Sequence, residues 1–450
     1  MKAVKTTQKA DRPPINSPLR QIMSSSAMLI VVAVLLSLLV SAVLVVAFDQ
    51  KVQESAAYLF ARPSDFLGYA GTAFASFFTS LFRGAIFDYQ ATSAVGMIMP
   101  ITNSLTRSVP LILAGLSVAL AFRAGLFNIG AQGQLLVGAA LGVWTGLNIS
   151  LPYGLHLLVA MLLAVLGGAV WGAVPGILKA RVGANEVIVT IMMNSIAVFL
   201  TSYFLKSRVF IGNGYPGKSS TIPDTAAYPK LLGSAFNLHL GFLIALLAAV
   251  FVWWLLERST FGFELRAAGA NPNAARTAGI SVNRVIALTM IIAGALAGLA
   301  GTGPALGTER FLSAGTAGSI GFDAITVALL GASTPLGTVL AGILFGAFAS
   351  GASTMQAAAG IPVDIVSVSQ AVIVLLIAAP PLIRWIFRLP EPIDSRIAKQ
   401  ATPPMSATKA DSKSEPTLAG APHAEKTNTQ PEGEAVATEH ETTGGKEAQS

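Results

Sequence analysis

Cysteine is absent from this 450-residue chain, and charged residues are scarce. The absence of cysteine excludes disulfides, thiolate metal sites and cysteine nucleophiles. Only 11% of the residues are charged and 53% are hydrophobic, whereas a soluble domain carries about 25% charged residues. Four histidines are too few for a convincing metal cluster, and two of them, His423 and His440, lie in a polar tail. This composition is typical of a polytopic membrane protein.

The N-terminal segment, residues 1–26, is polar and basic, with Asp11 as its single acidic residue. An unbroken apolar run from Met28 to Phe48 follows. A cleaved signal peptide has an apolar core of about 7–15 residues, so this longer run without a clear A-x-A site predicts an uncleaved first helix. The preceding basic residues predict a cytoplasmic N-terminus. The net charge of +7 is therefore interpreted through topology and not as a sign of nucleic-acid binding.

The rest of the chain predicts an all-α polytopic transmembrane helical bundle within residues 27–390. One crossing needs about 20 apolar residues, and the segments predict about eight to ten spans. These segments lie near 109–124, 130–147, 154–178, 188–205, 238–256, 285–303, 322–333, 335–355 and 364–387. The pair around 322–355 leaves open two short crossings or one crossing with a re-entrant piece. Residues 49–108 are mixed in composition, and we interpret them as partly interfacial.

The end of the chain differs from the spans. Arg384 and Arg388 follow the last apolar segment, which predicts a cytoplasmic C-terminus and an even number of crossings. The tail, residues 396–450, consists of polar and small residues without periodicity. Such a segment buries too little apolar surface to fold, so we expect it to be disordered. The chain is thus predicted to be a multi-pass protein of the plasma (inner) membrane with both ends in the cytoplasm.

Small residues recur at helical spacing in several spans. Glycines four residues apart let helices approach closely in lipid, and we interpret them as packing positions. The pairs are Gly168 and Gly172, Gly294 and Gly298, and Gly342 and Gly346. A weak internal echo also exists, because the sequences SVAL at 117–120 and TVAL at 326–329 each precede a glycine-broken stretch and an apolar run. Transporters often contain such repeats with broken helices.

The stretch GNGYPGKSS at 212–220 fits the phosphate-loop pattern G-x-x-x-x-G-K-[ST]. A working phosphate loop follows a buried strand and opens a helix. Here the stretch follows a predicted membrane helix, and Pro223 and Pro229 oppose a helix after it. Counting crossings places residues 206–237 outside, where ATP is scarce, although their four Lys and Arg residues oppose the positive-inside tendency. We interpret the stretch as turns in an exposed loop.

The stretch GFELRAAGANPNAARTAGI at 262–280 predicts a short cytoplasmic helix with both ends specified. Asn271 suits the N-cap, Pro272 the first helical position and Gly279 the position after the helix. The helix is predicted over about 272–278, roughly 10 Å long. Its mostly alanine side chains suit docking into a groove on another protein, and an ordinary amphipathic linker is the alternative.

This stretch resembles the cytoplasmic coupling loop of ABC-transporter permeases, which seats in the ATPase subunit. Three further stretches strengthen the resemblance: AFRAGLFNIGAQGQ at 121–134, GANEVIVTIMMN at 183–194 and GFDAITVALLG at 321–331. Together they are similar to the simple-sugar and nucleoside branch of the branched-chain-type permease family, over about residues 27–390. Two departures matter. The family often has Glu where Gln132 stands, and the tail from about 396 is not part of the family pattern.

The resemblance implies an ATP-driven importer subunit that forms the translocation path for a nucleoside or simple sugar and has no catalytic site, metal or cofactor of its own. Its implied partners are an ABC ATPase subunit that binds ATP, a second permease, and an extracytoplasmic substrate-binding protein. The second permease is either another copy of this chain or a non-identical homologue, and we favour the homologue because chains of this branch are often found with a non-identical sister. The loop 258–284 would dock on the ATPase. The residues implied for this docking are Gly262, Glu264, Arg266, Gly269, Asn271, Ala274, Ala275 and Gly279.

Four amides are candidates for the translocation path: Asn128, Gln132, Gln134 and Asn194. Unpaired amides in hydrocarbon are costly, so these side chains should face the bundle interior or water. Glycines at 125, 130 and 133 would let the backbone break there. Hydrogen bonding between helices is the alternative role. Amides suit polyhydroxylated or purine solutes, because they both donate and accept hydrogen bonds.

Two other classes of membrane protein compete with the importer. An ion-coupled secondary transporter of a small polar solute would need carboxylates or cation sites within the membrane. The candidates Glu186, Asp323 and Asp364 lie near the starts of spans, where a helix N-terminus already favours a carboxylate. An intramembrane enzyme would need a catalytic motif, and the sequence has neither H-E-x-x-H nor G-x-S-x-G.

Overall fold

The structure is a computed structural model that describes residues 26–211 and 217–378. Within these residues the secondary structure is helical, and the only β pairing consists of two isolated bridges. The predicted all-α fold is therefore confirmed. The predicted segment before Ser26, the centre of the phosphate-loop-like stretch and the predicted tail lie outside the described residues.

Seven of the described helices are long and apolar enough to cross a membrane. They are α2 (Ser26–Phe48), α5 (Ala94–Arg123), α7 (Leu155–Val182), α8 (Glu186–Phe204), α10 (Gly241–Arg258), α13 (Val282–Thr302) and α15 (Pro335–Ala359). Two shorter apolar helices, α14 (Ile320–Leu330) and α16 (Asp364–Ala378), bring the set to nine. The described residues thus hold seven long candidate spans, and the predicted total of eight to ten crossings stays a prediction.

Helix α14 decides the question left open around 322–355. It has 11 residues, which extend about 16 Å, whereas the hydrocarbon core of a bilayer is about 30 Å thick. The 25-residue helix α15 is long enough to cross by itself. This pair is thus one crossing preceded by a short helix that does not reach across the membrane alone.

The sequence did not predict the helices between residues 49 and 108. Helices α3 (Gln50–Ala56) and α4 (Pro63–Ala85) lie there, and α5 begins at Ala94 and continues through Pro100 and Pro110. Helix α4 buries only one stripe of side chains, which includes Ala73, Phe77 and Leu81 at four-residue spacing. Its mixed composition reflects that single buried stripe, and the helix packs against α15.

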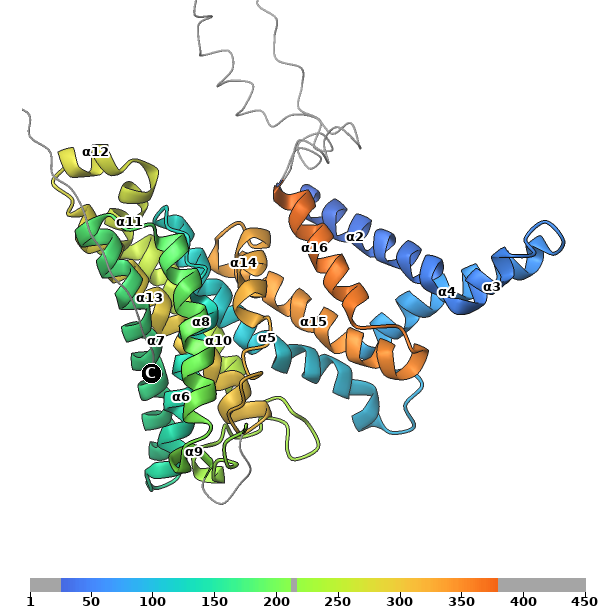
Figure 1. Ribbon diagram of the computed structural model, residues 1–450, viewed down its shortest axis with the longest axis horizontal. Coiled ribbons are helices and arrows are strands. Elements are labelled where there is room, and N and C mark those ends of the chain that lie inside the picture. Colours follow the sequence, from blue (N-terminus) through green and yellow to red (C-terminus); the bar gives the residue numbers. More distant parts are fainter. Residues whose placement is uncertain (1–25, 212–216, 379–450) are drawn as a thin grey trace, which may run out of the picture. The chain divides into compact units, whose positions relative to one another are not determined.

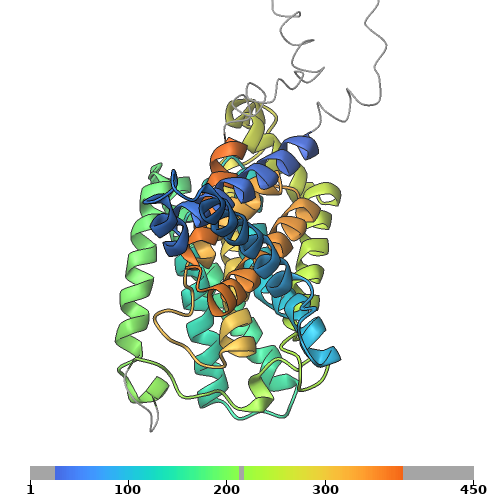
Figure 2. The same cartoon turned by 90° about the vertical axis from the view of Figure 1, so that its right-hand side faces the viewer.

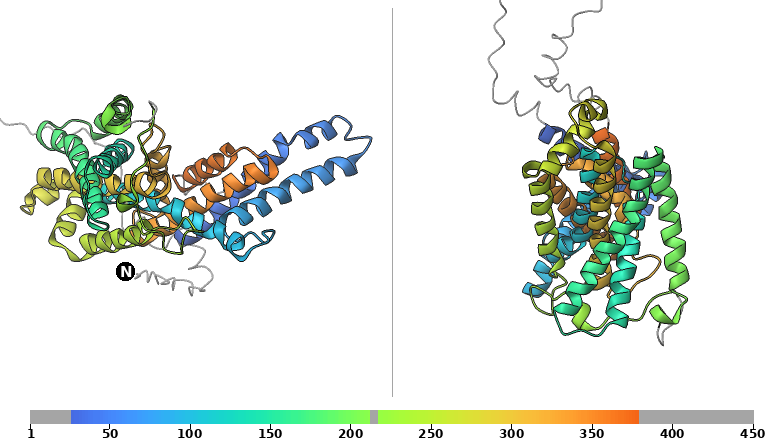
Figure 3. Two further views of the ribbon diagram at one scale, coloured as in Figure 1. Left: turned by 90° about the horizontal axis from the view of Figure 1, so that it is seen from below. Right: turned by 90° about the vertical axis from the view of Figure 1, so that its left-hand side faces the viewer.

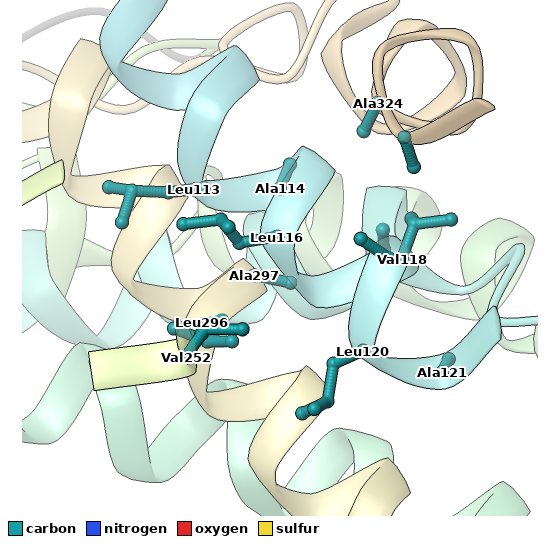
Figure 4. Packing of buried hydrophobic residues seen from close by; sticks show 14 of the residues in the cluster. Leu113, Ala114, Leu116, Val118, Leu120, Ala121, Val252, Leu296, Ala297 and Ala324 are labelled. Atoms are coloured by element: carbon teal, nitrogen blue, oxygen red, sulfur yellow. The ribbon is translucent and has the colours of Figure 1, made fainter. Parts of the chain in front are cut away.

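The main core cluster combines buried side chains of α5, α6 (Ala131–Asn148), α10 and α13. Figure 4 shows side chains of α5, among them Leu113 and Leu116, gathered with Val252 of α10 and Leu296 of α13. The glycine pairs of α7 and α13 face each other, as the four-residue spacing predicts. An added Cβ at Gly168 would overlap the carbonyl oxygen of Gly294, so these two helices touch backbone to backbone.

The connections at the two ends of the bundle differ. Helices α11 (Thr260–Ala270) and α12 (Pro272–Thr277) join α10 to α13 at one end (Figure 1). The connection between α8 and α10, with the short helix α9 (Arg208–Ile211), lies at the other end. Figure 2 and the right-hand view of Figure 3 show the same separation.

Candidate functional site

The predicted short helix is present as α12. The Asn271 side-chain oxygen accepts hydrogen bonds from the backbone N–H groups of Asn273 and Ala274, at 3.0 and 3.1 Å. Pro272 is the first residue of the helix, and Gly279 has a φ of 83°, a left-handed conformation that suits glycine. The N-cap, the first helical residue and the glycine after the helix are all confirmed.

The loop residues implied for docking divide into exposed and buried positions. Asn271, Ala274 and Gly279 are exposed, whereas Ala275 is only 3% exposed because it packs within this chain. Gly262 and Gly269 pack so closely that an added Cβ would overlap backbone atoms of neighbouring segments. Glu264 and Arg266 are partly exposed and border a depression of about 650 Å³ beside α12.

The phosphate-loop-like stretch has a different structure from a nucleotide site. Gly217 has a φ of 104° and forms a turn, as predicted. Ser219, however, is buried: its Oγ accepts a hydrogen bond from the backbone N–H of Leu312 and its own N–H donates to the Leu312 carbonyl, both at 2.8 Å. Residues 219–223 after this turn form no helix, and the Ser219 hydrogen bonds tie the turn to the loop at Leu312.

The four candidate amides lie together at the start of α6. Asn128 and Gln134 exchange two hydrogen bonds, at 2.9 and 3.1 Å. Asn194 of α8 accepts from the Gly133 N–H and donates to the Ile129 carbonyl. Gln132 donates to the Gly318 carbonyl and accepts from the Gly321 N–H, both at 2.7 Å. Each amide therefore has partners within the chain, and its place in the translocation path stays a prediction.

These hydrogen bonds surround a break in the helical structure. Residues 124–130, between α5 and α6, are not helical. Helix α6 has 18 residues and extends about 27 Å, whereas the 28-residue α7 beside it extends about 42 Å. Non-helical backbone at membrane depth is tolerated only where protein or a water-filled cavity satisfies it. Asn194 bonds two backbone groups at this break, Gln132 bonds backbone groups at the start of α14, and Asn128 and Gln134 bond each other. These bonds explain how all four amides can be buried.

A cavity of about 960 Å³ is lined in part by the segment that connects α8 to α10. Its wall includes one face of α5, the loop around 224–239, the π-helical turn η2 (Gly303–Thr308) and the start of α14. The wall carries three basic and three acidic residues, so their formal charges cancel. They are Arg107, Lys230, Arg310, Asp224, Glu309 and Asp323.

Sequence reasoning missed Tyr228 and His239, which form part of this wall. Their rings stack with centroids 5.2 Å apart and an interplanar angle of 2°. The His239 Nδ1 accepts the Gly241 N–H at 3.1 Å, and the Tyr228 hydroxyl is 2.6 Å from the Thr302 hydroxyl. Burial lowers the pKa of His239 to about 4, so its ring is neutral at physiological pH. The only sign of this ring pair in the sequence was that His239 lies outside the polar tail.

Comparison with known proteins shows to which family the chain belongs. Residues 100–379 match the family described as the permease component of branched-chain amino acid transport systems. This chain belongs to that family. The match covers more than half of the chain and includes the described helices from the first turns of α5 to α16.

Individual relatives in the permease family are ABC transporter components. The chain is 41% identical to the guanosine ABC transporter permease protein NupP of Bacillus subtilis, over 70% of this chain and 89% of NupP. It is 37% identical to the nucleoside ABC transporter permease protein NupB of Lactococcus lactis, over 64% and 81% of the two chains. It is 36% identical to the glucose ABC transporter permease protein TsgB13 of Haloferax volcanii, over 65% and 79%. No solved structure gives a significant match.

The family and the apolar helices together establish a multi-pass membrane permease of the ABC transporter class. The predicted resemblance is confirmed, including its nucleoside and sugar branch.

Proposed function

We propose that this permease forms the path for import of a nucleoside, with a simple sugar as the second candidate. The cavity carries this proposal. Its volume of about 960 Å³ is ample for one nucleoside, since small-molecule pockets measure about 300–1,000 Å³. The equal number of acidic and basic residues on its wall favours an uncharged solute over a phosphorylated one.

The polar groups on the cavity wall suit hydroxyl groups and base edges. Asn103 and Thr106 of α5 and Asn237 of the facing loop lie on the wall, and the Asn237 amide donates to the Asn103 side-chain oxygen at 3.2 Å. Amide and hydroxyl groups both donate and accept hydrogen bonds. Tyr153, which also borders the cavity, is largely exposed and provides an aromatic face for a purine. The similarity to a guanosine and a nucleoside permease supports this choice.

ATP would be bound and hydrolysed by a separate ATPase subunit, and this chain would hold no cofactor of its own. The exposed Ala274 of α12 and Gly279 after the helix would seat in that subunit, and the depression beside α12 would receive part of it. Docking by α12 would place this end of the bundle in the cytoplasm. The N- and C-termini would then be cytoplasmic, and the cavity would lie toward the outer side, where a substrate-binding protein delivers the solute.

A second, non-identical permease is the proposed partner within the membrane. Two organisms each have a pair of related permeases: NupB and NupC of Lactococcus lactis, and NupP and NupQ of Bacillus subtilis. This chain is 37% and 41% identical to one member of each pair but 26% identical to the other. Such asymmetry supports a pair made of two different chains.

The test is purification of the tagged protein from its native membrane in a gentle detergent, with mass spectrometry of the chains that accompany it. An ATPase subunit and a second permease are expected. The recovered assembly is then reconstituted with its substrate-binding protein, and uptake of labelled guanosine is compared with uptake of labelled glucose. Glucose uptake alone would overturn the nucleoside assignment. A stable chain that purifies without any ATPase would overturn the importer and direct the work to ion-coupled uptake.

A further inference from the structure

The coupling segment α11 rests directly on the end of α5. An added Cβ at Gly269 of α11 would overlap the carbonyl oxygen of Arg123, the last residue of α5. Gly125 has a φ of 70°, and a Cβ there would lie 3.2 Å from the Gly269 carbonyl oxygen. No side chain separates these two backbones, so a displacement of α11 acts on the end of α5 without a flexible layer between them.

The Arg123 side chain continues this contact to a third segment. Its Nε donates a hydrogen bond of 2.9 Å to the carbonyl oxygen of Ser333. Ser333 lies in the turn between α14 and α15, 210 residues further along the chain. The two segments correspond to the internal echo in the sequence, because 117–120 precede the end of α5 and 326–329 precede the end of α14. Arg123 therefore links the end of α5 to the turn between α14 and α15.

The turn that receives this hydrogen bond is strained. Ala332 and Ser333 have φ values of 50° and 51°, a left-handed conformation that costs non-glycine residues energy. Two backbone hydrogen bonds stabilise this turn: the Ala332 N–H donates to the Leu329 carbonyl at 2.9 Å, and the Ser333 N–H donates to the Ala328 carbonyl at 2.8 Å. Strain of this kind concentrates in segments that switch between two conformations.

The opposite end of α14 forms part of the cavity wall. Ile320 and Asp323 border the cavity, and Gln132 of α6 holds the adjoining backbone through its bonds to Gly318 and Gly321. Helix α14 is about 16 Å long and packs along α5. It therefore joins the strained turn at one end to the solute cavity at the other.

We propose that Arg123 is a positioning residue that transmits movement of the α11–α12 loop to α14 and so to the wall of the cavity. The strained turn at Ala332 and Ser333 is the hinge in this connection. The inference rests on the proposed function, in which a partner ATPase moves the loop. It adds the route by which that movement reaches the solute.

The assembled importer is tested in proteoliposomes, where uptake of labelled guanosine and hydrolysis of ATP are measured in the same sample. Arg123→Met keeps much of the length of the side chain but removes the donor. It should retain assembly and ATP hydrolysis, while the guanosine imported per ATP falls about tenfold, the factor of one charge-assisted hydrogen bond. Arg123→Lys restores a donor and should recover most of that ratio. Arg181→Met, at an exposed arginine in the last turn of α7, is the matched control and should change neither quantity.

Ser333→Gly tests the hinge separately, since it keeps the carbonyl acceptor and lowers the cost of the left-handed turn. It should raise the thermal stability of the complex and lower guanosine uptake per ATP, because the turn then leaves its present conformation less readily. Normal uptake per ATP in both Arg123→Met and Ser333→Gly would overturn the proposal. A parallel loss of assembly, stability and ATP hydrolysis in Arg123→Met that Arg123→Lys does not rescue would also overturn it, because the residue would then be structural.

The proposed function can fail independently of this inference. If the wild-type importer carries glucose and not guanosine, the same ratios are measured with glucose. If no ATPase accompanies the permease, the coupling role fails with the proposed function. The hydrogen bond between Arg123 and Ser333 can still be tested in the purified permease, by hydrogen exchange of the backbone amides of residues 332–334. Arg123→Met should make this exchange faster.

Discussion

Gly168 of α7 and Gly294 of α13 meet backbone to backbone. A Cβ added to either residue would overlap the carbonyl oxygen of the other. Gly298 continues the contact on α13, where a Cβ would overlap the Ala164 carbonyl oxygen. These glycine contacts join α7 and α13, the two helices that pack most extensively on each other, and so fix the position of α13. The turn η2, which forms part of the cavity wall, continues directly from α13.

Gly168→Ala should therefore destabilise the protein. The methyl group has no room between two backbones, and overpacking of this kind costs about 1–3 kcal/mol. The apparent unfolding temperature in detergent, followed by differential scanning fluorimetry, should fall. Gly71→Ala in α4 is the control, because a Cβ there meets nothing within 4 Å. It should leave stability unchanged or raise it by up to about 1 kcal/mol. Equal behaviour of the two variants would contradict the close packing of α7 and α13.

Ala274→Arg and Ala275→Arg should separate docking from folding. Ala274 is exposed on α12, so its replacement should leave the unfolding temperature unchanged while the ATPase subunit no longer co-purifies. Ala275 is 3% exposed, and burying an unpaired charge destabilises the fold, so Ala275→Arg should lower that temperature in the permease alone. Retention of the ATPase and of uptake by Ala274→Arg would show that this side of α12 does not dock.

Lys218→Ala tests the phosphate-loop pattern. The Lys218 ammonium lies 5.5 Å from the centroid of the Phe311 ring, a contact worth about 0.5–1 kcal/mol at an exposed site. ATP hydrolysis by the assembled complex should survive the substitution, with at most a small loss of stability. Loss of hydrolysis at normal assembly would revive the nucleotide-site interpretation of residues 212–220.

His239 should make stability fall in mild acid. Burial lowers its pKa in the folded protein to about 4, whereas an unfolded histidine has a pKa of about 6.5. Between these values the unfolded chain binds more protons, so folding stability is lost as the pH falls from about 6.5 to 4, by on the order of 3 kcal/mol. His239→Gln removes this group. The unfolding temperature of the wild type should therefore drop more steeply than that of the variant from pH 7 to pH 4, and parallel curves would contradict the assigned burial.

Local signals explain why the coupling helix was predictable in detail. Asn271, Pro272 and Gly279 each act through the backbone of their nearest neighbours, so nine residues of sequence, 271–279, contain all the signals. Helix α4 was missed for the opposite reason. Its buried side chains form a single stripe, and the stripe is identified as a buried face only by the packing of α15 against it.

The sequence by itself determined that the chain crosses a membrane many times, where most of the spans lie and how α12 begins and ends. Long apolar runs and helix caps act locally or against lipid, and they need no knowledge of which helix lies beside which. Only the tertiary structure decided that the four amides find hydrogen-bond partners inside the bundle, that Ala275 is buried while Ala274 is not, and that Arg123 reaches Ser333. Those relationships join residues up to 210 positions apart, and they follow from the packing of helices against one another.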